Sequence, residues 1–202
     1  MGVLAGVAEA MAGAGDLDRA EALARSNPSP DWQARVLAGV AKAAAGAGDL
    51  DRAGALSGQA EAVARSINNP YLQARALADV AEAVADAGDL DRAEALARSI
   101  PDPYLQARAL ANLAAVVGGA GDLDRAGPLA RQAEALARSI NDPNRQARAL
   151  ADVAREAAPD QARSLLSLAL TAGTWQSLVD DLGRADPDAV IAIADEYLRP
   201  AP

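Results

Sequence analysis

The sequence predicts an all-α fold in which short antiparallel helix pairs stack into a solenoid. Two phrases alternate along the chain at near-regular intervals. The heptapeptide Ala-Gly-Asp-Leu-Asp-Arg-Ala begins at Ala14, Ala47, Ala87 and Ala120, and Gln-Ala-Arg begins at Gln33, Gln73, Gln106 and Gln146. The heptapeptides are 33, 40 and 33 residues apart, which is typical of units that bury their apolar faces only against neighbours. With 51% hydrophobic and 2% aromatic residues, the core must be built from Ala, Leu and Val, which suits closely packed helices.

The first helix of each unit is predicted by an apolar stripe with helical spacing. Leu77, Val80, Ala81 and Val84 fall at i, i+3, i+4 and i+7. The same stripe recurs in the other units as Leu110, Leu113, Ala114 and Val117, as Leu37, Val40, Ala41 and Ala44, and as Leu4, Val7, Ala8 and Met11. The change from extended chain to helix is marked by Pro-Tyr at Tyr71 and Tyr104 and by Pro-Asp-Trp at Trp32.

The heptapeptide predicts the turn and the start of the second helix. Its Gly can take the left-handed C′ position that ends the first helix, and the following Asp can cap the second helix through its side chain. Leu90, Ala93, Ala97 and Ile100 then form an inward stripe, which ends at Pro101. The 40-residue unit carries seven extra residues in this helix, so we expect longer second helices near 49–67 and 122–140, with Pro128 kinking or shortening the later one.

The turn phrase resembles the Gly-Asp-Tyr-(acidic)-x-Ala turn of tetratricopeptide repeats. The matching small residues are Ala20, Ala53, Ala93 and Ala126 in the second helix and Ala8, Ala41, Ala81 and Ala114 in the first. The chain departs from the family pattern in lacking the large aromatic residues of both helices. The resemblance covers residues 1–158 and implies a right-handed superhelix with units near 1–33, 34–73, 74–106 and 107–146 and a last unit that begins at 147.

The two ends of the chain are predicted to differ. Residues 159–202 are expected to form C-terminal capping helices, the first from Gln161 to Ala172, because a solenoid must cover its last apolar face. The N-terminus shows no such cap, and Met1 stands where other units have the Ala of Gln-Ala-Arg. We therefore expect that the sequence was cut from a longer protein at a repeat boundary.

Composition excludes several classes of function. A net charge of −9 argues against nucleic-acid binding, and the chain has neither His nor Cys for metal ligation or nucleophilic catalysis. We expect no catalytic, metal or cofactor-binding residues, no membrane span and a cytoplasmic location. Because Asp-Leu-Asp recurs in every turn, helix capping is a better interpretation than metal binding. A weaker alternative is a carboxylate-based enzyme that uses Asp180, Asp181, Asp195 and Glu196.

The candidate binding residues form a row on the first helices. Arg35, Arg75, Arg108 and Arg148 are predicted at the second position of four successive first helices. The resemblance implies that these helices line a concave groove, which stacked arginines would make suitable for an acidic peptide or a C-terminal carboxylate. Later positions on the same helices would add Lys42, Glu82, Asn112, Asp152 and Arg155.

Two competing interpretations stay open. The four arginines can instead form salt bridges between repeats, with the Asp residues of neighbouring turns as partners. In the same way Trp32, Tyr71 and Tyr104 fit packing between units as well as, or better than, peptide docking. The leading functional hypothesis is a protein-interaction module, the scaffold or sensor part of a larger bacterial signalling protein. The alternative is an element that self-assembles into homo-oligomers through its uncapped N-terminal unit.

Overall fold

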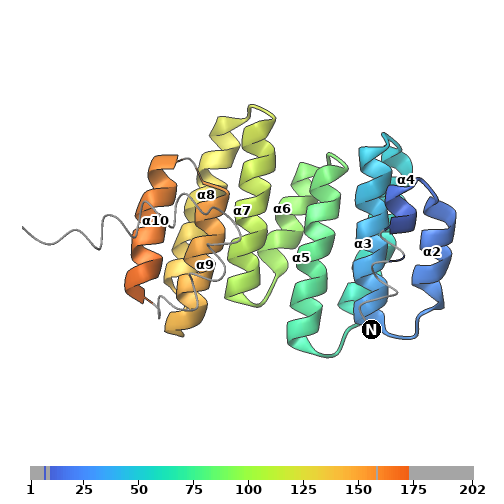
Figure 1. Ribbon diagram of the computed structural model, residues 1–202, viewed down its shortest axis with the longest axis horizontal. Helices are drawn as coiled ribbons and strands as arrows, with labels where there is room; N and C mark the ends of the chain where they lie inside the picture. Colours follow the sequence, from blue (N-terminus) through green and yellow to red (C-terminus); the bar gives the residue numbers. More distant parts are fainter. Residues whose placement is uncertain (1–6, 8–9, 158, 173–202) are drawn as a thin grey trace, which may run out of the picture.

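The computed structural model describes residues 7, 10–157 and 159–172 of the 202-residue chain. Within this part the structure is all-helical, without strands, and consists of helices packed in consecutive pairs (Figure 1). The first helices are α3 (Pro30–Gly46), α5 (Pro70–Asp86), α7 (Pro103–Gly119) and α9 (Pro143–Arg155). The second helices are α2 (Leu17–Ser26), α4 (Leu50–Arg65), α6 (Leu90–Ser99), α8 (Leu123–Arg138) and α10 (Pro159–Ala172).

The turn inside each pair follows from the heptapeptide, as predicted. Gly15, Gly48, Gly88 and Gly121 have φ between 81° and 90°, the left-handed region that side chains with a Cβ avoid. In the turn after α3, the amide of Gly48 donates to the Ala45 carbonyl and the amide of Asp49 donates to the Ala44 carbonyl, both at 2.9 Å. This is a Schellman motif. The Asp49 side chain then accepts from the Arg52 amide at 3.1 Å and caps α4.

The Gln-Ala-Arg phrase joins one pair to the next. Gln106 is the fourth residue of α7, and its side-chain amide donates to the carbonyl of Arg98 at 2.7 Å, in the last turn of the preceding second helix. Gln73 and Gln146 make the equivalent bonds to the carbonyls of Arg65 and Arg138. The Ala of the phrase is fully buried in all four copies, at Ala34, Ala74, Ala107 and Ala147. The phrase is therefore a structural joint.

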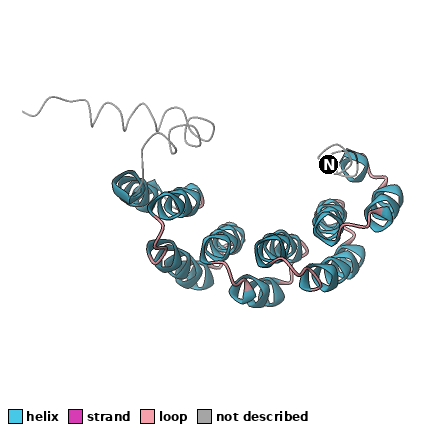
Figure 2. Ribbon diagram, turned by 90° about the horizontal axis from the view of Figure 1, so that it is seen from below, coloured by secondary structure: helices cyan, strands magenta, loops and turns pink. Residues whose placement is uncertain are grey.

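The helix pairs form a curved double row. Figure 2 shows α3, α5, α7 and α9 along the inside of an arc and the second helices along its outside. Each of these first helices packs against the next one, α3 on α5, α5 on α7 and α7 on α9. The predicted stripes of these helices are buried, including Leu77, Val80 and Leu110. In the first unit Val7 is 38% exposed and Met11 is partly buried, while Leu4 and Ala8 lie outside the described residues.

The second helices alternate in length because of the seven-residue insertion. The helices α2 and α6 have 10 residues, and α4 and α8 have 16. The expectation that Pro128 shortens α8 is wrong, since α8 runs through Pro128 and equals α4 in length. Proline removes one backbone hydrogen bond, and the packing of the buried Leu129, Ala133 and Ala137 keeps α8 helical despite this loss.

Several predictions for the chain ends fall on residues that the structure does not describe. The predicted helix from Gln161 to Ala172 is present as part of α10. The further capping helices within 173–202 and the residues Met1 and Gly2 lie outside the described part. Among the described helices none is both long and apolar enough to cross a membrane.

Candidate functional site

All nine candidate binding residues lie on the four first helices that line the inside of the arc. Arg35 and Lys42 are on α3, Arg75 and Glu82 on α5, and Arg108 and Asn112 on α7. Arg148, Asp152 and Arg155 are on α9. The four arginines of the row are the sixth residues of their helices, and the prediction of a second position is wrong. Each first helix begins at a proline three residues before Gln-Ala-Arg, because proline at N1 follows an extended N-cap residue.

Three of these arginines surround one carboxylate, Asp79 on α5. The Arg35 Nε donates to Asp79 Oδ2 at 3.1 Å from α3, and the Arg108 Nη2 lies 4.0 Å from Oδ1 on the α7 side. Arg75, one turn earlier on α5, adds a further attraction. Burial raises the pKa of Asp79, and the positive charges of Arg35, Arg108 and Arg75 oppose that shift. The cluster therefore holds more positive than negative charge.

Asp79 was not among the predicted groove residues, although its position in the repeat indicated it. It occupies the repeat position of Asn112 and Asp152, both of which were selected as groove residues. The expectation that Asp residues of neighbouring turns would pair with the arginine row is wrong for Arg35. The turn residues Asp49 and Asp89 instead cap the second helices with their side chains.

Near the C-terminal end of α3, Lys42 pairs with two carboxylates of α5. The Lys42 Nζ on α3 lies 2.5 Å from Glu82 Oε1 and 3.6 Å from Asp86 Oδ2, both on α5. Burial lowers the pKa of Lys42, but the two carboxylates more than offset this, so its pKa is raised. Farther along, a small recess between α5 and α7 has the candidates Glu82, Arg108 and Asn112 on its walls. The apolar part of its lining includes Ala78, Ala81, Ala85, Ala109, Leu113 and Val116.

At the end of the row, α9 is tied back to α7. Asp152 Oδ2 accepts a hydrogen bond of 2.7 Å from the Tyr104 hydroxyl, and Asp152 Oδ1 pairs with Arg155 at 2.8 Å on its own helix. Burial and the Asp152 charge raise the pKa of Tyr104. Of the three aromatic residues in the predicted row, Trp32 is buried in the core, Tyr104 is partly buried and Tyr71 is 54% exposed. Trp32 therefore serves packing, whereas Tyr71 remains accessible.

A larger pocket opens where α5, α7 and α9 begin. It has a volume of about 710 Å³ and is lined by Pro70, Tyr71, Pro101, Asp102, Pro103, Tyr104, Arg145 and Arg148. Arg145 was not selected from the sequence. Its Nη2 lies 2.6 Å from Asp102 Oδ2, and its guanidinium carbon lies 5.9 Å from the centroid of the Tyr104 ring. Asp102 also caps α7 by accepting from the Leu105 amide at 3.0 Å, so one carboxylate serves both the helix and Arg145.

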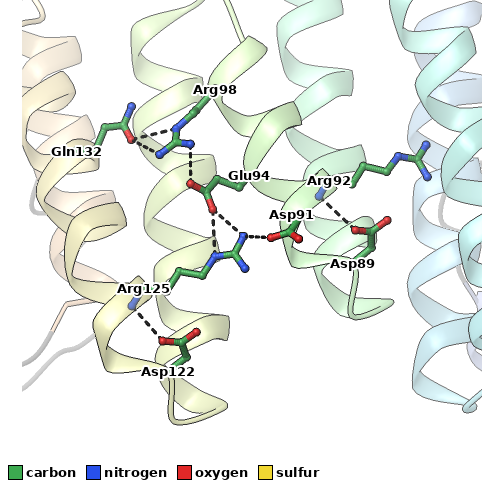
Figure 3. Close-up of polar contacts among 8 residues, drawn as sticks. All are labelled: Asp89, Asp91, Arg92, Glu94, Arg98, Asp122, Arg125 and Gln132. Carbon is green, nitrogen blue, oxygen red and sulfur yellow. Dashed lines mark hydrogen bonds and ion pairs between the residues drawn. The ribbon is translucent and has the colours of Figure 1, made fainter.

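The outer row carries a ladder of ion pairs that the sequence analysis missed. The Arg of each of three heptapeptides reaches a carboxylate on the preceding second helix, Arg52 to Glu21, Arg92 to Glu61 and Arg125 to Glu94. Figure 3 shows one step, in which Arg125 contacts Glu94 at 2.7 Å and Asp91 at 2.8 Å. Glu94 is also paired with Arg98, whose guanidinium reaches Gln132 on α8. The same ion pair recurs at three successive steps of the outer row, which marks the ladder as structural.

The described residues contain no group of three or more His, Cys, Asp or Glu side chains that could hold a metal ion. The carboxylates of the enzyme hypothesis, Asp180, Asp181, Asp195 and Glu196, lie outside the described residues.

Comparisons with known proteins inform the fold alone. No family model matches the chain, and no curated protein matches it either. Among solved structures it is similar to Ton1535 from Thermococcus onnurineus NA1, with a TM-score of 0.53 and 18% sequence identity. The likeness covers 96% of this chain and 56% of that one, so the chain spans little more than half the length of Ton1535. The described residues form an all-helical structure with helices packed in neighbouring pairs, an arrangement compatible with a helical repeat array.

Proposed function

We propose that this protein is a tetratricopeptide-like interaction module that binds an acidic segment of another protein along the inside of its arc. The observation that carries the proposal is the Asp79 cluster, where Arg35 bonds to one carboxylate and Arg108 and Arg75 attract the same carboxylate. A surface with excess positive charge on a chain of net charge −9 is an uneven distribution that favours an acidic partner. The right-handed superhelix of the family belongs to the same proposal.

The arginines are suited to recognition because they are held without being covered. Arg35 is 41% exposed although it bonds to Asp79, and Arg75 is also exposed. A guanidinium has five donors, so one bond to Asp79 leaves others for a carboxylate of the partner. Beside Arg108, Val116 is 37% exposed and offers an apolar contact to an aliphatic side chain of the partner. Charge would select the segment, and this contact would help to set its register.

Wider roles follow only from analogy with similar arrays. The module would be the scaffold or sensor part of a larger bacterial signalling protein in the cytoplasm. No catalytic activity, cofactor, nucleic acid or membrane is part of the proposal.

The test compares two variants that lose the same charge on opposite faces. Arg35→Gln with Arg75→Gln removes two arginines from the inside of the arc, and Arg19→Gln with Arg131→Gln removes two exposed arginines from the outer helices α2 and α8. Partners are captured from lysate and identified by mass spectrometry, after circular dichroism has shown that both variants fold. We expect the inner variant to lose partners that the outer variant keeps. Equal retention by both variants would contradict the proposal.

A second candidate, end-to-end stacking of copies, has one observation in its favour. Arg19 on α2 corresponds to Arg52, Arg92 and Arg125 of the ladder, but it pairs with Asp16 of its own turn, and its side chain is 78% exposed. A carboxylate from another copy would complete the ladder there. Light scattering over a hundredfold range of concentration tests this candidate, and a constant monomer mass would remove it.

A further inference from the structure

A carboxylate of the protein itself engages the arginine row formed by Arg35, Arg75, Arg108 and Arg148. Asp79 Oδ2 accepts a hydrogen bond of 3.1 Å from Arg35 Nε, and Asp79 Oδ1 lies 4.0 Å from Arg108 Nη2. An acidic segment of a partner presents the same chemical group to the same guanidiniums. Asp79 and such a segment therefore compete for these donors.

The fold does not require a carboxylate at this position. The equivalent residues of the other first helices are Gly39, Asn112 and Asp152, so the repeat accepts a glycine or a neutral amide there. Burial raises the pKa of Asp79 in spite of the nearby arginines, which means that its ionised form is disfavoured in the folded protein. At neutral pH the charge of Asp79 thus lowers the free energy of unfolding. The stability of the fold does not explain why the charge is there.

The hydrogen bond to Asp79 leaves Arg35 only partly available. A guanidinium can grip a carboxylate with two parallel bonds, either through Nε and one Nη atom or through its two Nη atoms. Asp79 engages Nε of Arg35, so the first of these edges is taken. The second edge remains open, since the Arg35 side chain is 41% exposed, but a carboxylate that binds there is repelled by the charge of Asp79.

We propose that Asp79 is a built-in competitor, which limits the affinity of the inner surface for an acidic segment and makes binding tighter as the pH falls. The inference rests on the proposed function, because it concerns the same arginines and the same class of partner. At neutral pH the ionised Asp79 repels the carboxylates of the segment. When Asp79 is protonated, this repulsion disappears while the positive charge of the arginines remains.

The charges around Asp79 come from three helices. Arg35 faces it from α3 and Arg108 from α7, and Arg75 lies one turn earlier on α5. Glu82 follows on α5 and is paired with Lys42. The helices α4 and α6 also pack on α5, but they lie on the outside of the arc (Figure 2).

The experiment measures binding of a labelled peptide of about eight residues that carries cysteic acid at its acidic positions. The sulfonate stays ionised at every pH used, so a change of affinity with pH comes from the protein. Fluorescence anisotropy with the full chain gives the affinity from about pH 7 to about pH 4, the range above the ordinary pKa of an aspartate. A glutamate peptide of the same length, measured at neutral pH only, serves as the carboxylate reference.

The repeat supplies a substitution that keeps the fold. Asp79→Asn introduces the residue that α7 has at this position, Asn112, and its amide oxygen can still accept the hydrogen bond from Arg35. Asp79→Ala removes the acceptor as well as the charge. Asp51→Asn, on the outer helix α4, removes the same charge from an exposed position away from the arginine row. Urea unfolding should show that Asp79→Asn is no less stable than the unsubstituted protein.

We expect both Asp79 variants to bind the sulfonate peptide about fivefold more tightly at neutral pH, the effect of one charge at contact range in water, and Asp51→Asn to leave the affinity unchanged. As the pH falls, the affinity of the unsubstituted protein should approach that of Asp79→Asn. Other inner carboxylates, such as Glu82 and Asp152, are present in both proteins, so their titration cancels in this comparison.

Several results would overturn the inference. One is unchanged or weaker binding by Asp79→Asn, and another is an equal pH dependence of Asp79→Asn and the unsubstituted protein. Unchanged binding by Asp79→Asn together with weaker binding by Asp79→Ala would show that Asp79 only positions Arg35. A complete lack of binding by Asp79→Asn also counts against the inference, because the arginines are then free of the competitor.

The variant with both Arg35→Gln and Arg75→Gln separates this inference from the proposed function. If it loses the peptide while Asp79→Asn gains nothing, the proposed function stands and the competitor is refuted. If it binds the peptide as tightly as the unsubstituted protein does, the arginines are not the binding surface and the proposed function fails.

Discussion

The ion pair between Arg92 and Glu61 gives the sharpest test of how the units are held together. Glu61 on α4 is 8% exposed, and its Oε2 accepts two hydrogen bonds from Arg92 on α6, from Nε at 3.1 Å and from Nη2 at 2.5 Å. Its other oxygen pairs with Arg65 of its own helix. We consider a double-mutant cycle of Glu61→Gln, Arg92→Gln and the variant with both substitutions.

The expected coupling lies between the values for exposed and buried pairs. Exposed ion pairs contribute about 0.2–1 kcal/mol, and hydrogen bonds to charged groups contribute about 1.5–3 kcal/mol. The Arg92 side chain is 36% exposed, so solvent screens its charge, whereas the Glu61 side chain is 11% exposed. We therefore expect a coupling of about 1–2 kcal/mol, reduced from the buried value by this screening.

The assay is urea unfolding followed by circular dichroism at 222 nm, for the four proteins of the cycle. Asp18→Asn provides the matched control, because Asp18 lies 2.5 Å from Arg52 in the same ladder but is 88% exposed. It should leave the unfolding midpoint unchanged. A coupling below about 0.5 kcal/mol, or an equal effect of Asp18→Asn and Glu61→Gln, would refute the view that burial sets the strength of the ladder.

Three further predictions concern the turn, the core and a titrating group. Gly88→Ala should lower the free energy of unfolding by about 1 kcal/mol or more, because φ at Gly88 is 86°. Gly54→Ala should raise it by about 0.5–1 kcal/mol, because Gly54 lies in a helix with open space at the Cβ. Urea unfolding compares the two variants. Leu110→Ala should cost about 2–5 kcal/mol in the same assay, because Leu110 is fully buried and a cavity results. The pKa of Tyr104 should exceed its ordinary 10.0, because burial and the Asp152 charge disfavour the phenolate, and Asp152→Asn should lower it. Its contribution to stability is therefore complete below pH 10 and is lost as pH rises through the folded pKa; the difference in absorbance titration between the protein and Tyr104→Phe isolates this group.

The helices and turns could be predicted because their determinants are local. Gly48 and Asp49 end one helix and cap the next through bonds to residues at most five positions away. The buried stripe of Leu77, Val80 and Val84 follows from the helical period of the same segment. Arg35 was predicted at the second position of its helix, but α3 begins at the proline of Pro-Asp-Trp, so Arg35 is the sixth residue.

The candidate site could be predicted from the sequence only in part. The sequence located the face, since Arg35, Arg108 and the other selected residues all lie on the inner helices. It did not identify Asp79 as their partner, because Arg35 and Asp79 are 44 residues apart and meet only when α3 packs on α5. Arg145 was missed because its departure from the repeat becomes meaningful only beside Asp102 and Tyr104.

The sequence by itself determined the class of the fold, the helix pairs, their turns and the positions that face the core. These depend on backbone conformation and on the period of apolar residues, both of which are written into a few consecutive residues. Only the tertiary structure decided which charges pair along the outer ladder, how Asp79 is shared and where Tyr71, Tyr104 and Arg145 enclose a pocket. Those contacts join residues from different units, so they depend on the angle and distance at which whole helices pack.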